Sequence, residues 1–520
     1  MNAKLNQASP PELDIQVGKK REALAYLQPV LLETRHGVNQ IAGAKLILVA
    51  PEGTMSNLKE HAQDAARCAV GADIVIKTKS GVVLFSGVVV QQECRLQRDR
   101  AELVLKLRHP LQRLTVSHRS QLFEKKTDAD ILRALLKEHR IDLGRVAGLG
   151  VTHPQLIQFA CSDWQFVKTR LHANGVWLLP TEKGVDVIQP KLAAKADHTL
   201  QAEASQLAPG VLEEAHWRFS SEDQPKKLEV AAWDITQQAM SRTALAKAPA
   251  IGSGGLDPAR LTTLSDLPWE LLSSMPMAAD EQTALAAARL LAQHAQGVQA
   301  SFTVMGSTAY SVGETLALSG FGSHFDGAGI ITEIRHQMSQ GLWRTTLSLG
   351  CDCARGIDTA LLPSVPSGLH IGVVDSYAKD AANLDRLRVT VPALKLGKKA
   401  LWARFAAPYA SKDCGLCLYP EAGDEVVLGF FEDDPRYPVI LGAMHNPKNK
   451  APHPPSADNQ IKTLRFGKGD DVQVLSFDAK EGAVTLASGK DQMVLKKGIA
   501  LSADKDLSMA AQKIDIAARQ

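Results

Sequence analysis

Cysteine is scarce in this sequence, and that scarcity limits the folds open to it. The chain carries 7 cysteines in 520 residues, and its first residues lack the apolar core of a secretory signal. Disulfide scaffolds belong to short secreted chains dense in cysteine, so we expect none here. Cys351 with Cys353 and Cys414 with Cys417 can be written as a four-thiolate zinc site. Buried or unused thiols are the favoured interpretation, because the two pairs lie in different predicted domains.

Long apolar runs and a charge imbalance are missing as well. The apolar stretch at residues 41–50 is short and is interrupted by Lys45, so it predicts no membrane-spanning helix. We expect the protein to be made and folded in the cytosol. Lys and Arg number 59 against 56 for Asp and Glu, and the two signs are interleaved along the chain. This balance disfavours nucleic acid as a partner.

One local cluster of charge keeps a nucleic-acid alternative open. It combines bases and aromatic rings in the manner of an OB-fold binding face, at Lys395, Lys398, Lys399, Trp402, Arg404 and Phe405. A solvated loop is the favoured interpretation, because the chain as a whole is nearly neutral.

Sequence motifs for catalysis and for metal binding are few. No HExxH or HxH histidine pair occurs, and the GSGGL segment at residues 252–256 lacks the GK[ST] of a phosphate loop, so it predicts a flexible loop. Glu432, Asp433 and Asp434 form an acidic run before Pro435. A catalytic carboxyl needs a raised pKa and a second carboxylate across a cleft, whereas adjacent acids in a turn are mostly solvated. We therefore predict a hairpin corner, no enzyme activity, no cofactor and no bound metal.

The pattern that the sequence does contain is predominantly that of short β-strands. Residues 72–90 alternate apolar and polar positions around a Ser-Gly turn, which predicts a hairpin. Thr127 precedes a helical stripe and is a predicted N-cap. Residues 241–276 are rich in Pro, Gly and Ser and predict an exposed insertion. Beyond Asp470, apolar-x-apolar units recur that are too short to bury a core alone, so stacking or inter-chain winding is implied.

The domain boundaries follow from these shifts in composition. The predicted units are a first β-barrel at 1–125, helical elements with a second region and a flexible insertion at 126–296, closing strands of a second barrel at 297–365, an OB-fold barrel at 366–447, a Pro-rich linker at 448–466 and a stem of short stacked strands at 467–520.

The segment at residues 415–454 carries a recognisable series of glycines, strands and prolines. It reads GLCLYPEAGDEVVLGFFEDDPRYPVILGAMHNPKNKAPHP, and upstream segments read SDWQFVKTRLHANGVWL and GETLALSGFGSHFDGAGIITEIRHQMSQGLWRTTLSLG. Together they resemble the VgrG-type spike proteins of contractile injection systems, which are similar to the hub and spike of contractile phage tails. The resemblance covers nearly the whole chain.

The resemblance implies a mainly β fold with α+β character in the hub: two tube-like β-barrels with helices, an OB-fold barrel, and a C-terminal trimeric β-helix or β-prism stem. It implies a homotrimer that caps the inner tube of the apparatus and carries a membrane-piercing tip. The implied partners are the inner tube protein, baseplate components, a PAAR-like tip protein, effector cargo and, transiently, a target membrane. Assembly in the bacterial cytoplasm is expected, with release as a particle as one outcome.

The residues expected to matter are structural. For the barrel corners they are Gly423, Asp424, Asp434, Pro435 and Gly442, and for the wound stem they are Ile499, Leu501, Leu507, Met509, Ile514 and Ile516. Two alternatives stay open at this point: an envelope-degrading baseplate enzyme and an OB-fold nucleic-acid-binding protein. Whether the machine is a phage tail, a type VI apparatus or a released particle is not encoded in these motifs.

Overall fold

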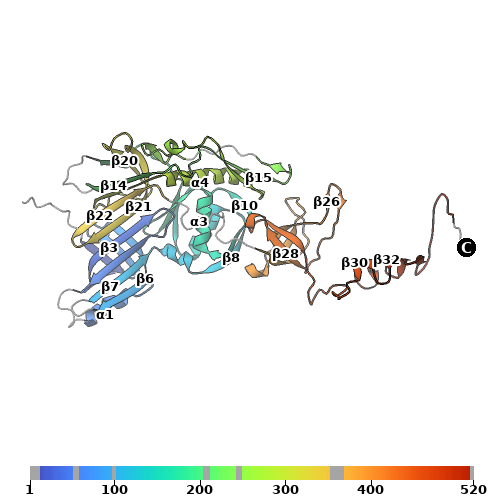
Figure 1. The fold of residues 1–520 in the computed structure, drawn as a ribbon. Helices are drawn as coiled ribbons and strands as arrows, with labels where there is room; N and C mark the ends of the chain where they lie inside the picture. The colour runs from blue at the N-terminus through green and yellow to red at the C-terminus, as the bar shows by residue number, and fades with distance from the viewer. Residues whose placement is uncertain are drawn as a thin grey trace, which may run out of the picture.

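The computed structural model describes residues 12–50, 58–96, 101–202, 211–241, 249–351 and 368–515. Figure 1 shows an elongated molecule in which three parts follow one another: a hub (described residues 12–351), a barrel (368–446) and a thin stem (461–515). Among the described residues, no helix combines the length and the apolar character needed to cross a membrane.

The hub is organised by one continuous 14-stranded sheet. Its main path contains β14 (Leu212–Phe219), β19 (Val298–Met305), β22 (Leu342–Leu349), β21 (Gly327–Ser339), β3 (Gln28–Gly37), β4 (Gly43–Val49), β7 (Ala101–Arg108), β6 (Val83–Leu96), β5 (Asp73–Thr78), β1 (Leu13–Val17) and β2 (Glu22–Ala23), and off this path lie β13 (His198–Gln201), β17 (Gly252–Gly254) and β20 (Thr315–Ser319). The antiparallel pairing of β3 with β21 joins the two hub regions that the sequence predicts as separate barrels. They therefore share one sheet.

Alternation of side chains along strands such as β4 gives this sheet one largely apolar face and one more polar face. Along β4, Leu46 and Leu48 are fully buried while Lys45 between β3 and β7 is exposed. The apolar face packs into cores that include Leu32, Leu105 and Phe302. Antiparallel sheets commonly bury one face and leave the other in water. Charged side chains such as Lys45 lie on the polar face.

A helical module connects the sheet to the barrel. It contains β8 (His118–Thr127), α2 (Asp128–Glu138), β9 (Asp142–Val146), β10 (Thr152–Ser162), α3 (Asp163–Ala173), β11 (Trp177–Pro180) and β12 (Gly184–Ile188), and the remaining helices are α1 (Leu58–Arg67) and α4 (Ala279–Gly297). The predicted N-cap is confirmed: the Thr127 hydroxyl accepts a hydrogen bond from the Asp130 N–H at 3.1 Å, and the Asp130 carboxylate returns to Thr127. Such capping boxes fix where a helix begins.

Residues 241–276 agree only in part with the exposed insertion that the sequence predicts, because residues 263–267 are exposed whereas Gly252, Leu256 and Pro258 are buried. The described part contains β17 and β18 (Trp269–Ser273), and β18 pairs in parallel with β15 (Leu228–Asp234), beside which lies β16 (Ala239–Met240). The GSGGL segment is packed rather than loose, because a Cβ at Gly255 would lie 2.2 Å from the His324 carbonyl oxygen. Glycine permits this close backbone approach. The glycines of the GSGGL segment therefore allow close packing at this point of the chain.

The barrel is closed and five-stranded, as the sequence predicts. Its strands are β23 (His370–Val374), β24 (Leu387–Thr390), β25 (Leu401–Phe405), β28 (Glu425–Phe430) and β29 (Pro438–Ala443), with a short hairpin of β26 (Ala410–Ser411) and β27 (Cys414–Gly415) outside the closed circuit. Leu122 and Ile157 from β8 and β10 belong to the same apolar core as the barrel residues Val389 and Leu428. Hub and barrel thus share a core.

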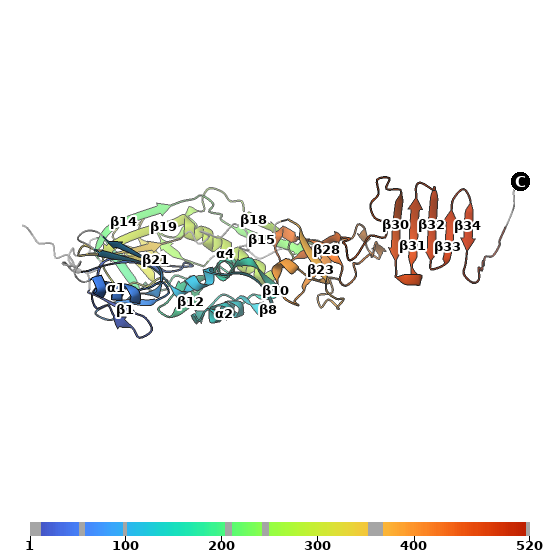
Figure 2. The same cartoon turned by 90° about the horizontal axis from the view of Figure 1, so that it is seen from below.

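The stem is a five-stranded antiparallel meander, which Figure 2 shows face-on beyond the barrel. It consists of β30 (Ile461–Phe466), β31 (Gln473–Asp478), β32 (Ala483–Ser488), β33 (Asp491–Leu495) and β34 (Ile499–Ser502). β30 lies inside the predicted Pro-rich linker at 448–466, so the stem begins earlier than the composition indicated. Residues 503–515, predicted as further strands, form none in this chain.

Candidate functional site

The junction of hub and barrel is built on a buried arginine. Arg436, at the corner between β28 and β29, donates from Nε and Nη2 to the carboxylate of Asp434, with the shortest contact at 2.7 Å. Its Nη1 donates to Glu281 on α4 at 2.5 Å, so the guanidinium joins the barrel corner to a hub helix. The side chains of Arg436 and Asp434 are only 4% and 3% exposed. Planar guanidinium groups suit such two-sided carboxylate contacts.

A second buried ion network adjoins the first one inside the hub. Asp128, at the start of α2, accepts from Arg170 Nε at 2.7 Å and from Arg170 Nη2 at 3.1 Å. Its Oδ2 also accepts from Asn174 Nδ2 at 2.9 Å and lies 3.0 Å from His153 Nε2. Arg170, Asn174, Glu281 and Arg436 line one narrow space between the two networks. Charges of alternating sign therefore run continuously from α2 to the barrel corner.

Burial and pairing act in opposite directions on the pKa values of these carboxyls. Burial alone raises the pKa of Asp128, but the charge of Arg170 and the hydrogen bond from His153 outweigh it and hold this pKa well below its usual range. For Glu281, burial is likewise outweighed by the nearby Arg436 and Arg170 charges, so its pKa is also lowered. Buried carboxylates stay ionised only when paired in this way. Both carboxyls are therefore held in their charged form by the neighbouring arginines.

The acidic run at 432–434 is a corner, as predicted, but it is not a solvated one. Asp434 and Pro435 are buried, and Asp434 is fully engaged by Arg436. Glu432 is exposed, yet its carboxylate accepts hydrogen bonds from the Ser273 hydroxyl at 3.0 Å and from the Ser274 N–H in the hub. The corner therefore docks onto β18. No local pattern around residues 432–434 indicates this docking, because the partners lie about 160 residues upstream.

Two of the other predicted corner residues, Gly423 and Asp424, hold the turn that precedes β28. Gly423 has φ +91°, a left-handed conformation that favours glycine. The Asp424 carboxylate accepts from the Glu421 N–H at 2.9 Å and from Asn449 Nδ2 at 3.2 Å. Gly442 lies in β29 opposite Val427, with open space where a Cβ would stand. Gly423 and Asp424 thus shape one turn, and the structure does not bring Gly442 to the Asp434 corner.

The basic and aromatic cluster near Trp402 does not form an open binding face. Lys399 Nζ donates to the Leu122 carbonyl of the hub at 3.2 Å. Arg386 lies 5.6 Å from the centroid of the Trp402 ring, and both residues line a cleft of about 250 Å³ between hub and barrel. Single-stranded nucleic acid needs exposed stacking platforms. Trp402 instead faces the hub, which weakens the nucleic-acid alternative.

The stem presents an apolar ladder on one face of its sheet. Cross-strand partners place leucine or methionine side by side on every stem strand, at Leu464, Leu475, Leu486, Met493 and Leu501. Leu464, Leu486 and Leu501 are 46%, 57% and 50% exposed in the single chain. Residues one position away, such as Thr485 opposite Ser476, point to the other face, since side chains alternate along a strand. One apolar face is therefore uncovered.

The predicted stem residues fall only partly on this ladder. Leu501 belongs to it, and Ile499 flanks it on the same face, opposite Leu495. Leu507, Met509 and Ile514 are exposed in the segment without strands, and Ile516 lies outside the described residues. Leu464, Leu475, Leu486 and Met493 were missed, although period-two alternation in each of their segments is the signal that finds them.

Metal and thiol chemistry finds little support in the described residues. No group of three or more His, Cys, Asp or Glu side chains there is arranged to hold a metal ion. Cys351 is disulfide-bonded, whereas Cys414 and Cys417 are free and exposed. A disulfide sulfur cannot serve as a zinc thiolate. The four-thiolate site therefore loses one of its ligands.

Comparison with known families decides where the chain belongs. Residues 15–340, more than half of the chain, match the family described as the Alg8 N-terminal domain. The chain belongs to the Alg8 N-terminal domain family. Residues 370–445, which contain the closed barrel, match the family described as the type VI secretion system/phage-baseplate injector OB domain.

Curated relatives of this Alg8-family chain are spike proteins. Over 99 residues it is 30% identical to the type VI secretion system spike protein VgrG3 of Vibrio cholerae, covering 18% of this chain and 10% of that protein. Over 90 residues it is 30% identical to VgrG1a of Pseudomonas aeruginosa, covering 16% of this chain and 14% of that protein. The chain thus spans only a small part of the length of these relatives.

Solved structures extend the likeness to the whole fold. The E. coli protein c3393, described as a type VI secretion component similar to the phage T4 tail proteins gp27 and gp5, has a TM-score of 0.53 at 14% identity over 83% of this chain and 100% of its own. The lidded Francisella PdpA-VgrG complex gives a TM-score of 0.60 at 11% identity over 96% of this chain and 81% of that chain. The Alg8-family chain therefore has the fold of VgrG-type spikes, which confirms the predicted resemblance and fold class.

Proposed function

We propose that this protein is the trimeric central hub and spike of a contractile injection apparatus. In this role it caps the inner tube, docks on the baseplate and carries a piercing tip, and its work is mechanical and not enzymatic. The fold and the family matches support the class of protein. The single observation that carries the trimer is the uncovered apolar ladder of the stem.

The ladder needs a partner because an isolated meander of this kind has no core. Every ladder leucine stays partly in water in the single chain, and burying one is worth about 1.5 to 3 kcal/mol. Three copies that turn this face inward form a three-sided prism in which the ladders meet on the axis, while the Ser and Thr face remains wet. Cyclic closure thus covers the apolar face, which as an exposed patch would otherwise favour aggregation.

The junction supports the mechanical part of the proposal. Force applied along the molecule must pass from the hub sheet through α4 and the barrel into the stem. A shared apolar core and a buried ion network resist hinge motion there better than a short linker does. A rigid spike concentrates the work of sheath contraction on a small tip, so no covalent chemistry is required.

The partners and the location follow from the same role. The inner tube protein and the baseplate would meet the wide hub end, and a separate PAAR-like tip protein would cap the stem. Effector cargo and brief contact with a target membrane fit the role, and nucleic acid does not. We propose assembly in the bacterial cytoplasm, followed in one version by release within an injection particle.

The test uses neighbouring residues that point to opposite faces of one strand. Leu486→Glu places a charge on the apolar ladder, whereas Thr485→Glu places the same charge on the wet face. We expect light scattering to give a mass of three chains for the unaltered protein and for Thr485→Glu, and a lower mass for Leu486→Glu. A chain that ends at Asn459 removes the stem and should also lose the trimer or hold it more weakly.

Three results would contradict the proposal. A full-length protein that is monomeric in solution would contradict trimerisation, which is the central step of the proposal. Equal trimer stability in the two glutamate variants shows that the ladder is not the trimer core. Hydrolysis of peptidoglycan or glycan by the pure protein would favour the baseplate enzyme instead.

A further inference from the structure

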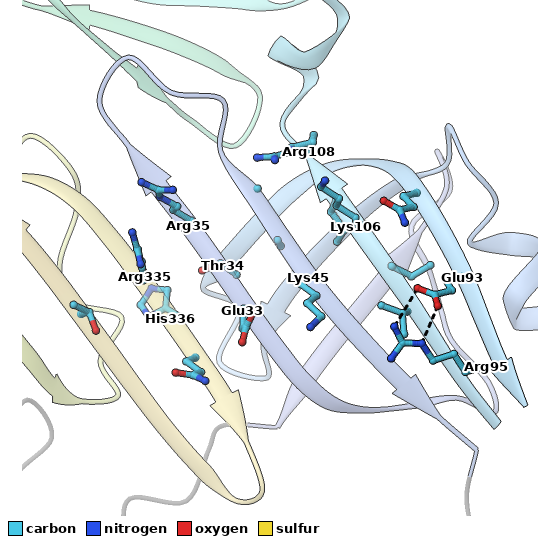
Figure 3. Close-up of a pocket in the computed structure, with 18 residues that line it drawn as sticks. Glu33, Thr34, Arg35, Lys45, Glu93, Arg95, Lys106, Arg108, Arg335 and His336 are labelled. Carbon is cyan, nitrogen blue, oxygen red and sulfur yellow. Dashed lines mark hydrogen bonds and ion pairs between the residues drawn. The ribbon is translucent and has the colours of Figure 1, made fainter. Parts of the chain in front are cut away.

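The polar face of the hub sheet contains a hollow of about 720 Å³ that the spike role leaves unexplained. Strands β3, β4, β6, β7, β21 and β22 contribute its lining, and Figure 3 shows basic side chains on this face. We name as the basic face the side chains of Arg35, Lys45, Lys106, Arg108 and Arg335. Two carboxylates, Glu33 and Glu93, lie among them.

The strand register places like charges directly opposite one another on this face. Arg35 of β3 pairs with Arg335 of β21, and Lys45 of β4 pairs with Lys106 of β7. Directly opposed like charges destabilise a sheet, because the side chains lie only a few ångströms apart. A face built for stability alone would alternate the signs. The arrangement instead concentrates positive charge in the middle of a wide sheet.

The two like-charged pairs differ in how they are neutralised. Glu333 accepts from Arg35 Nε at 2.7 Å and from Arg335 Nε at 2.5 Å, so a carboxylate of the chain itself holds that pair together. Arg95 is likewise held by Glu93 at 2.9 Å. In the described part of the chain, neither Lys45 nor Lys106 forms an ion pair or a side-chain hydrogen bond. Among the described residues of the basic face, the lysine pair therefore lacks an anion, as does Arg108, whose Nη1 donates to the Ile41 carbonyl oxygen at 3.5 Å.

The lining also restricts the kind of anion. Among the residues that the structure describes, no Phe, Tyr or Trp lines the hollow, so unstacked bases would find no such ring to stack on. Glu33 lies opposite Lys45 in the neighbouring strand and interrupts the positive charge, which disfavours a continuous phosphate backbone. Carboxylates spaced by uncharged residues can pair with the lysines and avoid Glu33. An acidic peptide meets this requirement.

We propose that the basic face binds an acidic segment of a partner protein in extended form, with its carboxylates on Lys45 and Lys106. The Glu333 carboxylate is an example of this contact within the chain, because it accepts hydrogen bonds from both members of the neighbouring pair, Arg35 and Arg335. The inference rests on the register and charge of the hub sheet and does not depend on the trimeric spike.

The experiment measures binding of a fluorescein-labelled peptide of alternating glutamate and glycine to the purified full chain, by fluorescence anisotropy at low salt. We expect the double variant Lys45→Gln with Lys106→Gln to bind about tenfold more weakly, as the loss of two exposed ion pairs predicts. The matched control, Lys191→Gln with Lys195→Gln, removes the same charge from exposed lysines outside the hollow and should bind unchanged. Glu33→Gln should bind more tightly.

A second readout separates binding from folding. The Lys45 and Lys106 double variant removes a like-charge pair, so its melting temperature should equal or exceed that of the unaltered protein. Equal peptide affinity in the two double variants would overturn the proposal. So would equal binding of the matching glutamine and glycine peptide, or tighter binding of an oligothymidylate that the lysine substitutions abolish, since that result assigns the face to nucleic acid.

Discussion

Arg436→Met is the substitution that tests the junction most directly. Methionine keeps much of the apolar length of arginine but leaves Asp434 and Glu281 buried without their shared cation. Removing one partner of a buried ion pair costs about 3 to 5 kcal/mol, because the remaining charge stays desolvated. Because two carboxylates lose their partner here, we expect Arg436→Met to destabilise the junction by about 3 to 5 kcal/mol. The barrel should part from the hub locally before either unfolds.

Hydrogen exchange followed by mass spectrometry suits this test, because a multidomain chain has no single unfolding free energy. A loss of 3 kcal/mol speeds exchange through local opening by roughly a hundredfold. We expect this in peptides that cover β28, β29 and the start of α4, with β6 and β7 unchanged as the internal reference.

Two further variants make the result decisive. Arg145→Met breaks a surface pair with Asp186 and should change little, since Arg145 is 78% exposed. The triple variant with Arg436→Met, Glu281→Gln and Asp434→Asn removes the stranded charges and should recover most of the protection. If Arg436→Met exchanges no faster than Arg145→Met, the buried network does not hold hub and barrel together and the reasoning is wrong.

Two other predictions concern acid and the far stem. Burial lowers the pKa of His109 and His172 to about 4 from an ordinary 6.5, so the unfolded chain binds more protons between these values, and hub stability should fall as pH drops from 6.5 to 4. The His109 Nδ1 accepts from the Leu111 N–H at 3.2 Å, and His109→Asn should keep that cap while making the melting-temperature curve against pH shallower. A glutamate at Leu507 or Ile514 should weaken the wound stem, which sedimentation over a dilution series measures; an unchanged trimer would exclude these residues from the core.

How far the sequence predicts this fold depends on the distance over which each feature is encoded. Alternation and capping are local, so the strands around residues 72–90, the N-cap at Thr127 and the closed barrel are predictable from neighbouring residues. The single hub sheet is not, because it depends on β3 finding a strand from the far end of the hub. The local periodicity of β3 does not indicate which distant strand it pairs with.

The candidate site shows the same limit. An acidic run indicates a solvated turn, and only the tertiary position of α4 makes Asp434 a buried partner of Arg436. Arg436 follows Asp434 by two residues, so a local ion pair was predictable, but its burial was not. In the stem, the prolines before Ile461 concealed β30 and shifted the predicted start of the ladder toward the C-terminus.

The pairing of β3 with β21 also has a consequence for synthesis. Arg35 and Glu333, which bond across these strands, are 298 positions apart. At ordinary translation rates of 5 to 20 residues per second, the second strand leaves the ribosome roughly 15 to 60 s after the first. During that interval β3 has only β4 beside it and offers an open hydrogen-bonding edge to any nascent neighbour. Slow translation and crowded polysomes should therefore reduce the yield of soluble protein.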